Sequence, residues 1–172
     1  MKRKNRIKVR RFVWGQRENA QILIVHFGSK STPLIAQAFR ELGYMSRIVL
    51  SKNIETTMEE HFFPLVVFSG GNRSVYEPNA PRVLREFIDK HTVRGTRFLG
   101  ICYGAQLFAF KFGGGVRPMF FTETGIAKLN LTASFGRYRG GALVMNHGDE
   151  VTTLPHGWKN FGSTDDCEHA LF

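Results

Sequence analysis

The sequence predicts an α/β fold with a doubly wound, mostly parallel sheet and a small antiparallel β addition. Short, continuous apolar runs alternate with helix-like segments between residues 21 and 112, as is typical of strands buried on both faces of a parallel sheet. Glycines follow two of these runs directly, at Gly70-Gly71 and at Gly100. After residue 112 the apolar runs become shorter and are separated by turn residues, which indicates the antiparallel part.

The elements follow one another at regular spacing. The predicted strands of the parallel sheet are residues 21–27, 46–50, 64–69 and 97–101, and the predicted helices are residues 33–42, 54–61, 80–91 and 105–112. Pro33 suits a first helical turn and Gly43 suits a helix end. The antiparallel part is predicted as strands at 126–131, 142–145, 151–154, 161–164 and 170–172, with Asn146–Asp149 as a tight polar turn between two of them.

Size and charge divide the chain into two parts. Its 172 residues, 42% of them hydrophobic, suffice for one domain with a core. Residues 1–20 hold eight of the 24 basic residues but one of the 14 acidic ones, within a net charge of +10. We therefore expect a basic, flexible leader at residues 1–19 and one domain at residues 20–172. Because the domain shows no basic face, nucleic acid is an unlikely partner.

Cysteine content and hydropathy indicate a compartment. No apolar stretch reaches the roughly 18 residues that a membrane span needs, and the basic start is not followed by the apolar core of a signal peptide. Two cysteines, Cys102 and Cys167, are too few for a disulfide framework. We therefore expect a cytoplasmic protein with free thiols and no membrane contact.

The segment Gly100-Ile101-Cys102-Tyr103-Gly104 has the pattern of a nucleophile elbow. A short apolar run leads into it and a helix-like run follows, so Cys102 falls at the tip of a strand-to-helix turn. Glycine has no side chain to crowd such a turn. The helix N-terminus is expected to favour the thiolate form of Cys102. The alternative is a buried structural cysteine beside two glycines.

A thiolate that attacks a carbonyl group also needs donors for the oxyanion and a base. The N–H of Tyr103, directly after the nucleophile, is one expected donor. The N–H of Gly71, at the carboxyl end of a neighbouring strand, is the other, since ligands bind at that edge of an open α/β sheet.

The base is harder to assign. The six histidines are His26, His61, His91, His147, His156 and His169. The pair Glu168 and His169 is disfavoured, because neighbouring residues of a predicted strand point to opposite faces. His147 has Asp149 as its one obvious orienter. The sequence predicts no metal site, since no His or Cys cluster has zinc spacing, and it contains neither a P-loop nor a dinucleotide-binding glycine motif.

Taken together, these segments resemble the class I glutamine amidotransferases, and within them the GMP synthase branch. The matching stretches are ILIVHFGS (22–29), SGGNRSVYEPNAPR (69–82), GICYGAQ (100–106), NHGD (146–149) and STDDC (163–167). They appear in the family's order over residues 21–172. The cysteine elbow marks the wider family, and the other segments point to the narrower branch.

The resemblance implies a reaction and a set of site residues. Cys102 would attack the side-chain amide of glutamine, release ammonia and form a glutamyl thioester that water hydrolyses, with the N–H groups of Gly71 and Tyr103 on the oxyanion. The substrate glutamine would be held by residues that match the family segments, namely Gly70, Gln106, Asn146, His147, Gly148 and Asp149. No cofactor is implied in this domain. ATP and magnesium would act on a partner, an ATP-pyrophosphatase domain or subunit that aminates XMP to GMP in purine biosynthesis.

The chain also departs from the family pattern. The family usually has Asp at His26, Gln at Lys30 and Pro at Asn72. Its catalytic His-x-Glu lies in a strand just beyond the point that this sequence reaches, and no residue matches it, so we expect a domain without its last strand or strands. Two alternatives stay open. One is a glutaminase for another ammonia acceptor, as in anthranilate or carbamoyl-phosphate synthesis, and the other is a non-catalytic binding module of the same fold.

Overall fold

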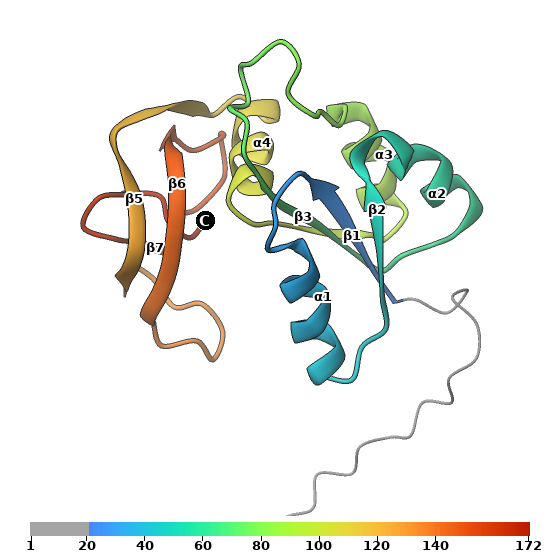
Figure 1. The fold of residues 1–172 in the computed structure, drawn as a ribbon, viewed down its shortest axis with the longest axis horizontal. Helices are drawn as coiled ribbons and strands as arrows, with labels where there is room; N and C mark the ends of the chain where they lie inside the picture. The colour runs from blue at the N-terminus through green and yellow to red at the C-terminus, as the bar shows by residue number, and fades with distance from the viewer. Residues whose placement is uncertain (1–20) are drawn as a thin grey trace, which may run out of the picture.

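In the described part of the chain, one of the helices lies between two β-sheets (Figure 1). The computed structural model describes residues 21–172, so the predicted leader, residues 1–19, lies outside the described residues. The elements are β1 (Ile22–Phe27), α1 (Thr32–Glu41), β2 (Ser46–Leu50), η2 (Ser51–Asn53), α2 (Ile54–Glu60), β3 (Leu65–Gly71), α3 (Arg85–Val93), β4 (Arg97–Gly100), α4 (Tyr103–Lys111), β5 (Gly115–Leu131), β6 (Gly141–Thr153) and β7 (Gly162–Ser163).

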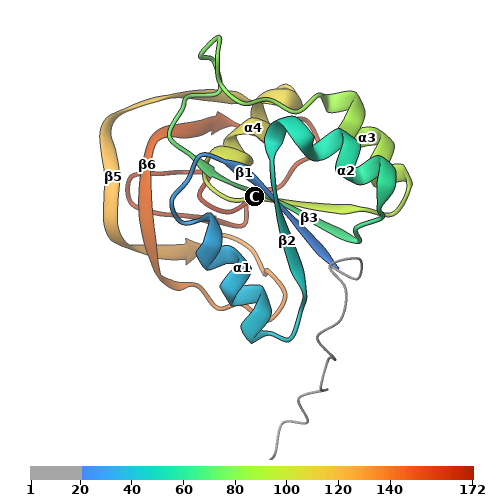
Figure 2. The ribbon, with the colours of Figure 1, turned by 45° about the vertical axis from the view of Figure 1, so that its right-hand side comes forward.

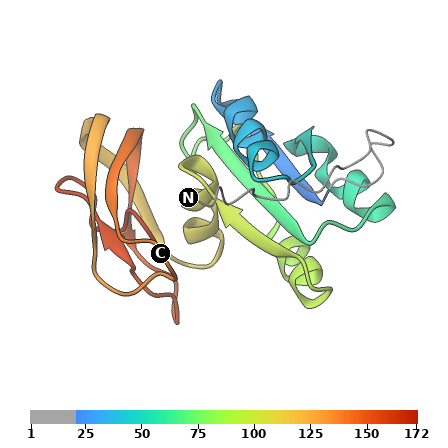
Figure 3. The ribbon, with the colours of Figure 1, turned by 90° about the horizontal axis from the view of Figure 1, so that it is seen from below.

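The first sheet is parallel, with strand order β2-β1-β3-β4, and it confirms the predicted α/β class. Residues of β1 alternate between its two faces. Ile22 and Ile24 pack with Ala36 of α1 on one face. Leu23 and Val25 belong to the larger core on the other face, to which α2, α3 and α4 contribute. Figure 3 shows this arrangement, with α4 between the two sheets.

An aromatic cluster lies beneath the start of α4. Phe68 of β3 stacks on Phe108 of α4 with ring centroids 4.7 Å apart. Phe27 of β1 contacts both Phe68, at 5.2 Å, and Tyr103, at 5.4 Å. Aromatic pairs at these distances stabilise a core beyond the area that they bury. The cluster therefore fixes α4 against the ends of β1 and β3.

The prediction of a helix from residue 80 is wrong in its first turn. Helix α3 begins at Arg85, and Leu84 before it is extended, with ψ of 145°. Ala80 and Val83 are nevertheless buried in the larger core. The spacing of these apolar residues, three apart, is that of a helix, but they belong to an irregular segment. The Tyr103 hydroxyl fixes this segment by donating a hydrogen bond to the carbonyl oxygen of Pro81.

The predicted turn at Asn146–Asp149 is also wrong, because these residues lie inside strand β6. β5 and β6 pair along most of their length and run side by side around one edge of the molecule (Figure 2). His147 lies opposite Glu123, whereas Asp149 lies opposite Pro118. The residues of β5 between those two partners form an irregularity in the ladder. β6 therefore continues through a polar, glycine-containing segment that suggested a turn.

The C-terminal segment contains less strand than predicted. β7 is two residues long, and Leu171 forms an isolated bridge with Gly162. Glu168 and His169 lie in a turn rather than on a strand. Within residues 21–172, no helix combines the length and the apolar character that crossing a membrane requires.

Candidate functional site

Cys102 stands at a strained turn between β4 and α4. Its backbone has φ of 52° and ψ of −115°, and it is the one non-glycine residue with positive φ in the described part of the chain. Such a conformation costs a residue with a side chain about 1–3 kcal/mol, and it persists only where the surroundings impose it. The predicted elbow is therefore present as a local backbone geometry.

The two glycines of the elbow are required by close backbone packing. A Cβ on Gly100 would lie 2.6 Å from the backbone N of Ala105. A Cβ on Gly104 would lie 2.7 Å from the Cβ of Phe68 and would overlap the carbonyl oxygen of Phe68. Backbone atoms cannot move aside as a flexible side chain can. α4 thus begins directly against β3 and β4, which aims Cys102 at the ends of the strands.

The local environment raises the pKa of the Cys102 thiol. Burial raises the pKa of the thiol, and this effect exceeds the lowering by hydrogen bonds from the backbone N–H groups of Tyr103 and Gly71. The carboxylate of Asp149 raises the pKa further. The N–H groups at the turn thus favour the thiolate, as expected, but desolvation of the charged form outweighs them and raises the pKa overall.

Gly70 and Gly71 end β3 beside the cysteine. A Cβ on Gly71 would lie 2.9 Å from the carbonyl oxygen of Phe27, so this backbone has no room for a side chain. A Cβ on Gly70 would lie 3.6 Å from the Cβ of Cys102. The two N–H groups that reach the sulfur, those of Gly71 and Tyr103, come from a strand end and a helix start that this packing holds rigidly.

A cavity of about 390 Å³ opens beside Cys102. Its lining includes most of the residues that the sequence predicted for the site: Gly71, Cys102, Gln106, Asn146, His147, Gly148 and Asp149. Gly70 and Tyr103 lie beside the cavity rather than on its wall. The loop after β3 adds Arg73 and Glu77, whose side chains form an ion pair of 2.8 Å. A cavity of this size and polarity suits a small polar metabolite.

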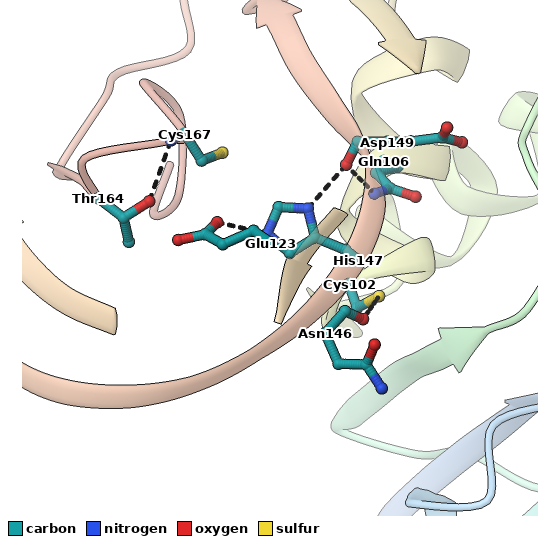
Figure 4. A network of polar contacts seen from close by, with 8 residues as sticks. All are labelled: Cys102, Gln106, Glu123, Asn146, His147, Asp149, Thr164 and Cys167. Carbon is teal, nitrogen blue, oxygen red and sulfur yellow. Dashed lines mark hydrogen bonds and ion pairs between the residues drawn. The ribbon is translucent and has the colours of Figure 1, made fainter. Parts of the chain in front are cut away.

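Two polar contacts join β6 to the nucleophile helix. The amide Nε2 of Gln106 donates to the carbonyl oxygen of Asp149 at 2.8 Å. The Sγ of Cys102 lies 3.9 Å from the carbonyl oxygen of Asn146. Figure 4 shows these residues with the side chains that surround them. The second sheet therefore closes the cavity that the first sheet and α4 begin.

His147 is held by a residue that the sequence did not indicate. Its Nε2 lies 2.8 Å from Oε2 of Glu123, and its Nδ1 lies 2.9 Å from the backbone carbonyl oxygen of Asp149 (Figure 4). Asp149 thus contacts His147 through its backbone and not as a carboxylate orienter. Because both ring nitrogens already have partners, this imidazole is not free to accept a proton from Cys102.

The other histidines of the described chain form no hydrogen bond with Cys102, although His169 lines a second cavity that Cys102 also lines. The Nδ1 of His26 is 2.9 Å from the hydroxyl of Thr32. His91 is buried, and burial lowers its pKa. The Nδ1 of His169 is buried without a hydrogen-bond partner. Among residues 21–172, no imidazole forms a hydrogen bond with the Cys102 thiol.

Glu123, His147 and Cys167 form a group that could hold a metal ion. One ligand atom from each lies within 4.8 Å of the others. Carboxylate, imidazole and thiolate are all zinc ligands. The three residues come from β5, β6 and the C-terminal segment, so a search for local zinc spacing could not find them. Burial raises the pKa of the Cys167 thiol to about 11, and the hydrogen bond of 2.8 Å already satisfies Glu123 and His147.

The fold and the site together define a class of protein, an α/β domain with a cysteine at a nucleophile elbow and two backbone N–H groups beside the sulfur. A family model for class-I glutamine amidotransferases matches residues 23–171. The chain therefore belongs to the class-I glutamine amidotransferase family.

Curated relatives agree with the family. The chain is 37% identical over 157 residues to a probable glutamine-hydrolyzing GMP synthase of Leptospira interrogans, a match that covers 88% of this chain and 25% of that protein. It is 36% identical over 165 residues to a glutamine-hydrolyzing GMP synthase of Nitratiruptor, covering 89% of this chain and 30% of that protein. The chain thus spans less than a third of the length of these relatives.

Solved structures share the fold. A putative GMP synthase subunit from Thermoplasma acidophilum superposes with a TM-score of 0.68 at 27% identity, covering 86% of this chain and 74% of that one. A glutamine amidotransferase of Thermotoga maritima superposes with a TM-score of 0.64 at 18% identity, covering 86% of this chain and 68% of that one. The predicted fold class, including the antiparallel addition, is thereby confirmed.

Proposed function

We propose that this chain is the glutamine-hydrolysing part of a GMP synthase, and that Cys102 is its nucleophile. The observation that carries the proposal is the strained elbow, which points the Cys102 sulfur at the N–H groups of Gly71 and Tyr103. Family membership and the curated relatives named GMP synthase support the same reading.

In the proposed reaction, the Cys102 sulfur attacks the side-chain carbonyl carbon of glutamine. The oxygen becomes an oxyanion between the N–H groups of Gly71 and Tyr103, where each donor is typically worth about 3 kcal/mol in the transition state. The C–N bond then breaks as the amide nitrogen takes up the proton that the thiol has lost, so that ammonia leaves and a glutamyl thioester remains on Cys102. Water hydrolyses the thioester to glutamate and restores the thiol. These steps need no cofactor in this domain.

The cavity offers complementary groups for the rest of the substrate. The carboxylate of Asp149 faces the site closely enough to raise the pKa of Cys102, and it is the proposed partner of the substrate ammonium group. Gln106, Asn146, His147 and Gly148 form the wall that would hold the glutamine chain. Gly70, which has no side chain, would leave room for the substrate carbonyl beside Cys102 at the end of β3.

The ammonia acceptor is also part of the proposal. We infer that an ATP-pyrophosphatase domain or subunit, with ATP and magnesium, takes the ammonia to aminate XMP, because the named relatives are GMP synthases. A glutaminase for another acceptor would keep the same cysteine chemistry. The two are separated by which synthetase, with its own substrates present, increases glutamine hydrolysis by this chain.

Two observations favour a non-catalytic role. The Cys102 thiol has a raised pKa, and none of the described imidazoles bonds to it. A neutral thiol without a base attacks an amide slowly, since the thiolate is the reactive form. In this alternative the chain binds glutamine without turning it over.

The test measures glutamate release from glutamine with and without a GMP-forming ATP-pyrophosphatase partner, ATP, magnesium and XMP. We expect the partner to stimulate hydrolysis, a glutamyl adduct on the Cys102 peptide in mass spectrometry, and loss of both in Cys102→Ala. Hydrolysis that continues undiminished in Cys102→Ala would exclude the nucleophile assignment. Glutamine binding without any adduct, in the presence of the partner, would favour the non-catalytic role.

A further inference from the structure

We propose that Glu123 is a positioning residue for the Cys102 site, acting through His147 on residues 146–149 of β6. The Glu123 carboxylate reaches the cavity wall through its hydrogen bond with this imidazole. The inference deepens the proposed function, and it rests on that function where it concerns glutamine. Its mechanical part, the docking of β6 on α4, stands independently.

The proton positions follow from the hydrogen bonds. The carbonyl oxygen of Asp149 can only accept, so Nδ1 of His147, at 2.9 Å, must carry a hydrogen. The other ring nitrogen faces Oε2 of Glu123 at 2.8 Å, and one proton lies between them. Whether that proton is on the ring or on the carboxyl group, Nδ1 keeps its hydrogen.

Glu123 therefore holds the His147 ring at Nε2 in the orientation that brings Nδ1 to the Asp149 carbonyl oxygen. A neutral imidazole carries one hydrogen and can place it on either nitrogen. Without Glu123, the ring could carry its hydrogen on Nε2 and would then turn a lone pair toward the Asp149 carbonyl oxygen, which repels it. A carboxylate that fixes the orientation of a functional histidine is a recurrent arrangement in proteins.

The pair is shielded from water. The His147 side chain is 10% exposed and the Glu123 side chain 5% exposed. A buried polar group that loses its partner is not fully rescued by solvent. The effect of removing Glu123 should therefore exceed that of removing an exposed ion pair from the same two strands.

One carbonyl connects this pair to the nucleophile helix. The backbone carbonyl oxygen of Asp149, which accepts from His147, also accepts from Nε2 of Gln106 at 2.8 Å. Gln106 lies one turn after Cys102 on α4. The carbonyl oxygen of Asn146, in the same segment of β6 as Asp149, lies 3.9 Å from the Cys102 sulfur. Glu123 thus acts at a distance on the wall that faces the sulfur.

The first test uses the unsubstituted chain. Nitrogen-15 NMR of the imidazoles should show a hydrogen on Nδ1 of His147. A His147 that carries its only hydrogen on Nε2 would overturn the proposal. This measurement needs no variant and no substrate, so its result is independent of glutamine turnover.

The second test compares Glu123→Ala with Glu123→Gln and with Arg117→Ala, all with a chelator present so that no metal ion contributes. Arg117 is a matched control, because it forms an exposed ion pair of 3.0 Å with Glu150 across the same strands. Amide hydrogen exchange at residues 146–149 should rise at least tenfold in Glu123→Ala and stay within threefold of the original in Arg117→Ala. Glu123→Gln can donate its amide to Nε2, so it should restore slow exchange.

The third measurement reports on substrate positioning. A glutamine-like diazoketone should alkylate Cys102 with a saturable rate, whereas iodoacetamide reports thiol reactivity alone. Glu123→Ala should raise the half-saturating diazoketone concentration about tenfold and leave the iodoacetamide rate unchanged. Glu123→Gln should return the half-saturating concentration to that of the original chain. A role in stability only would lower the melting temperature without moving half-saturation.

The outcomes separate the two proposals. A folded Glu123→Ala variant with unchanged exchange and unchanged half-saturation overturns the positioning role. If Glu123→Ala does not fold, the NMR of His147 in the original chain and the amide hydrogen exchange of Glu123→Gln at residues 146–149 decide whether Glu123 has the positioning role. If the original chain shows no saturable labelling, the proposed glutamine site fails, while exchange at residues 146–149 still tests the role of Glu123.

Discussion

Replacing Cys102 with glycine should give a more stable protein than replacing it with alanine, which reverses the usual order. Both changes remove the thiol, so its lost contacts cancel in the comparison. Alanine keeps a Cβ at φ of 52° and ψ of −115°, and glycine does not. The strain relieved is about 1–3 kcal/mol. Glycine loses about 0.5–1 kcal/mol through the greater freedom of its unfolded chain. The net difference is roughly 1 kcal/mol in favour of glycine.

Equilibrium urea unfolding of the two variants measures this difference, provided that their m-values agree. Ala38→Gly is the matched control, because Ala38 is an exposed residue of α1 with ordinary helical geometry. That change should cost about 1 kcal/mol. If Ala38→Gly shows its normal cost and Cys102→Ala is still as stable as Cys102→Gly, the elbow is not strained and the reasoning fails.

Two further predictions concern the stability of the folded state. Gly104→Ala should lower the free energy of unfolding by about 3 kcal/mol, since its Cβ would overlap the backbone of Phe68. Gly148→Ala is the control, because its Cβ would lie 3.7 Å from the nearest atom, and it should cost under about 1 kcal/mol in the same urea titration. Similar costs for the two variants would refute the close packing of Gly104. Cys167 has a pKa raised to about 11 by burial, so the folded state keeps its proton at a pH where the unfolded state has lost it, and stability should fall as pH rises from about 9 to 11 by roughly 2–3 kcal/mol. Cys167→Ala should flatten this part of the stability curve, and parallel curves for the two proteins would refute it.

The features that could be predicted from sequence are local ones. The four parallel strands are short apolar runs, and each was expected within two residues of its observed bounds. The elbow was also foreseeable, because its glycines and cysteine are contiguous and because a strand, a turn and a helix follow one another. Gly70-Gly71 was placed correctly at the carboxyl edge of β3. In each case, neighbours in sequence determine the geometry.

The features that were missed depend on partners distant in sequence. Asn146–Asp149 is polar and contains glycine, so it suggested a turn, yet pairing with β5 keeps it extended. Glu123 is 24 residues from His147 and reaches it only through the register of β5 and β6. The register of the two strands shifts at an irregularity of β5 between Pro118 and Glu123. The sequence pattern does not predict this shift, so it does not predict that Glu123 pairs with His147.

The thiol and the two N–H groups at the elbow also constrain how the proposed reaction can proceed. In the free protein, the N–H groups of Gly71 and Tyr103 lower the pKa of Cys102, although burial keeps it raised overall. In the proposed reaction the same two groups bind the substrate oxygen, and the sulfur then loses their help. The thiolate would become less favourable at the moment when it is needed. A base that takes the thiol proton during the attack would offset this loss. His147 cannot serve while Glu123 and Asp149 hold both of its nitrogens. An imidazole brought to Cys102 would therefore raise the rate of thioester formation without any change in the elbow itself.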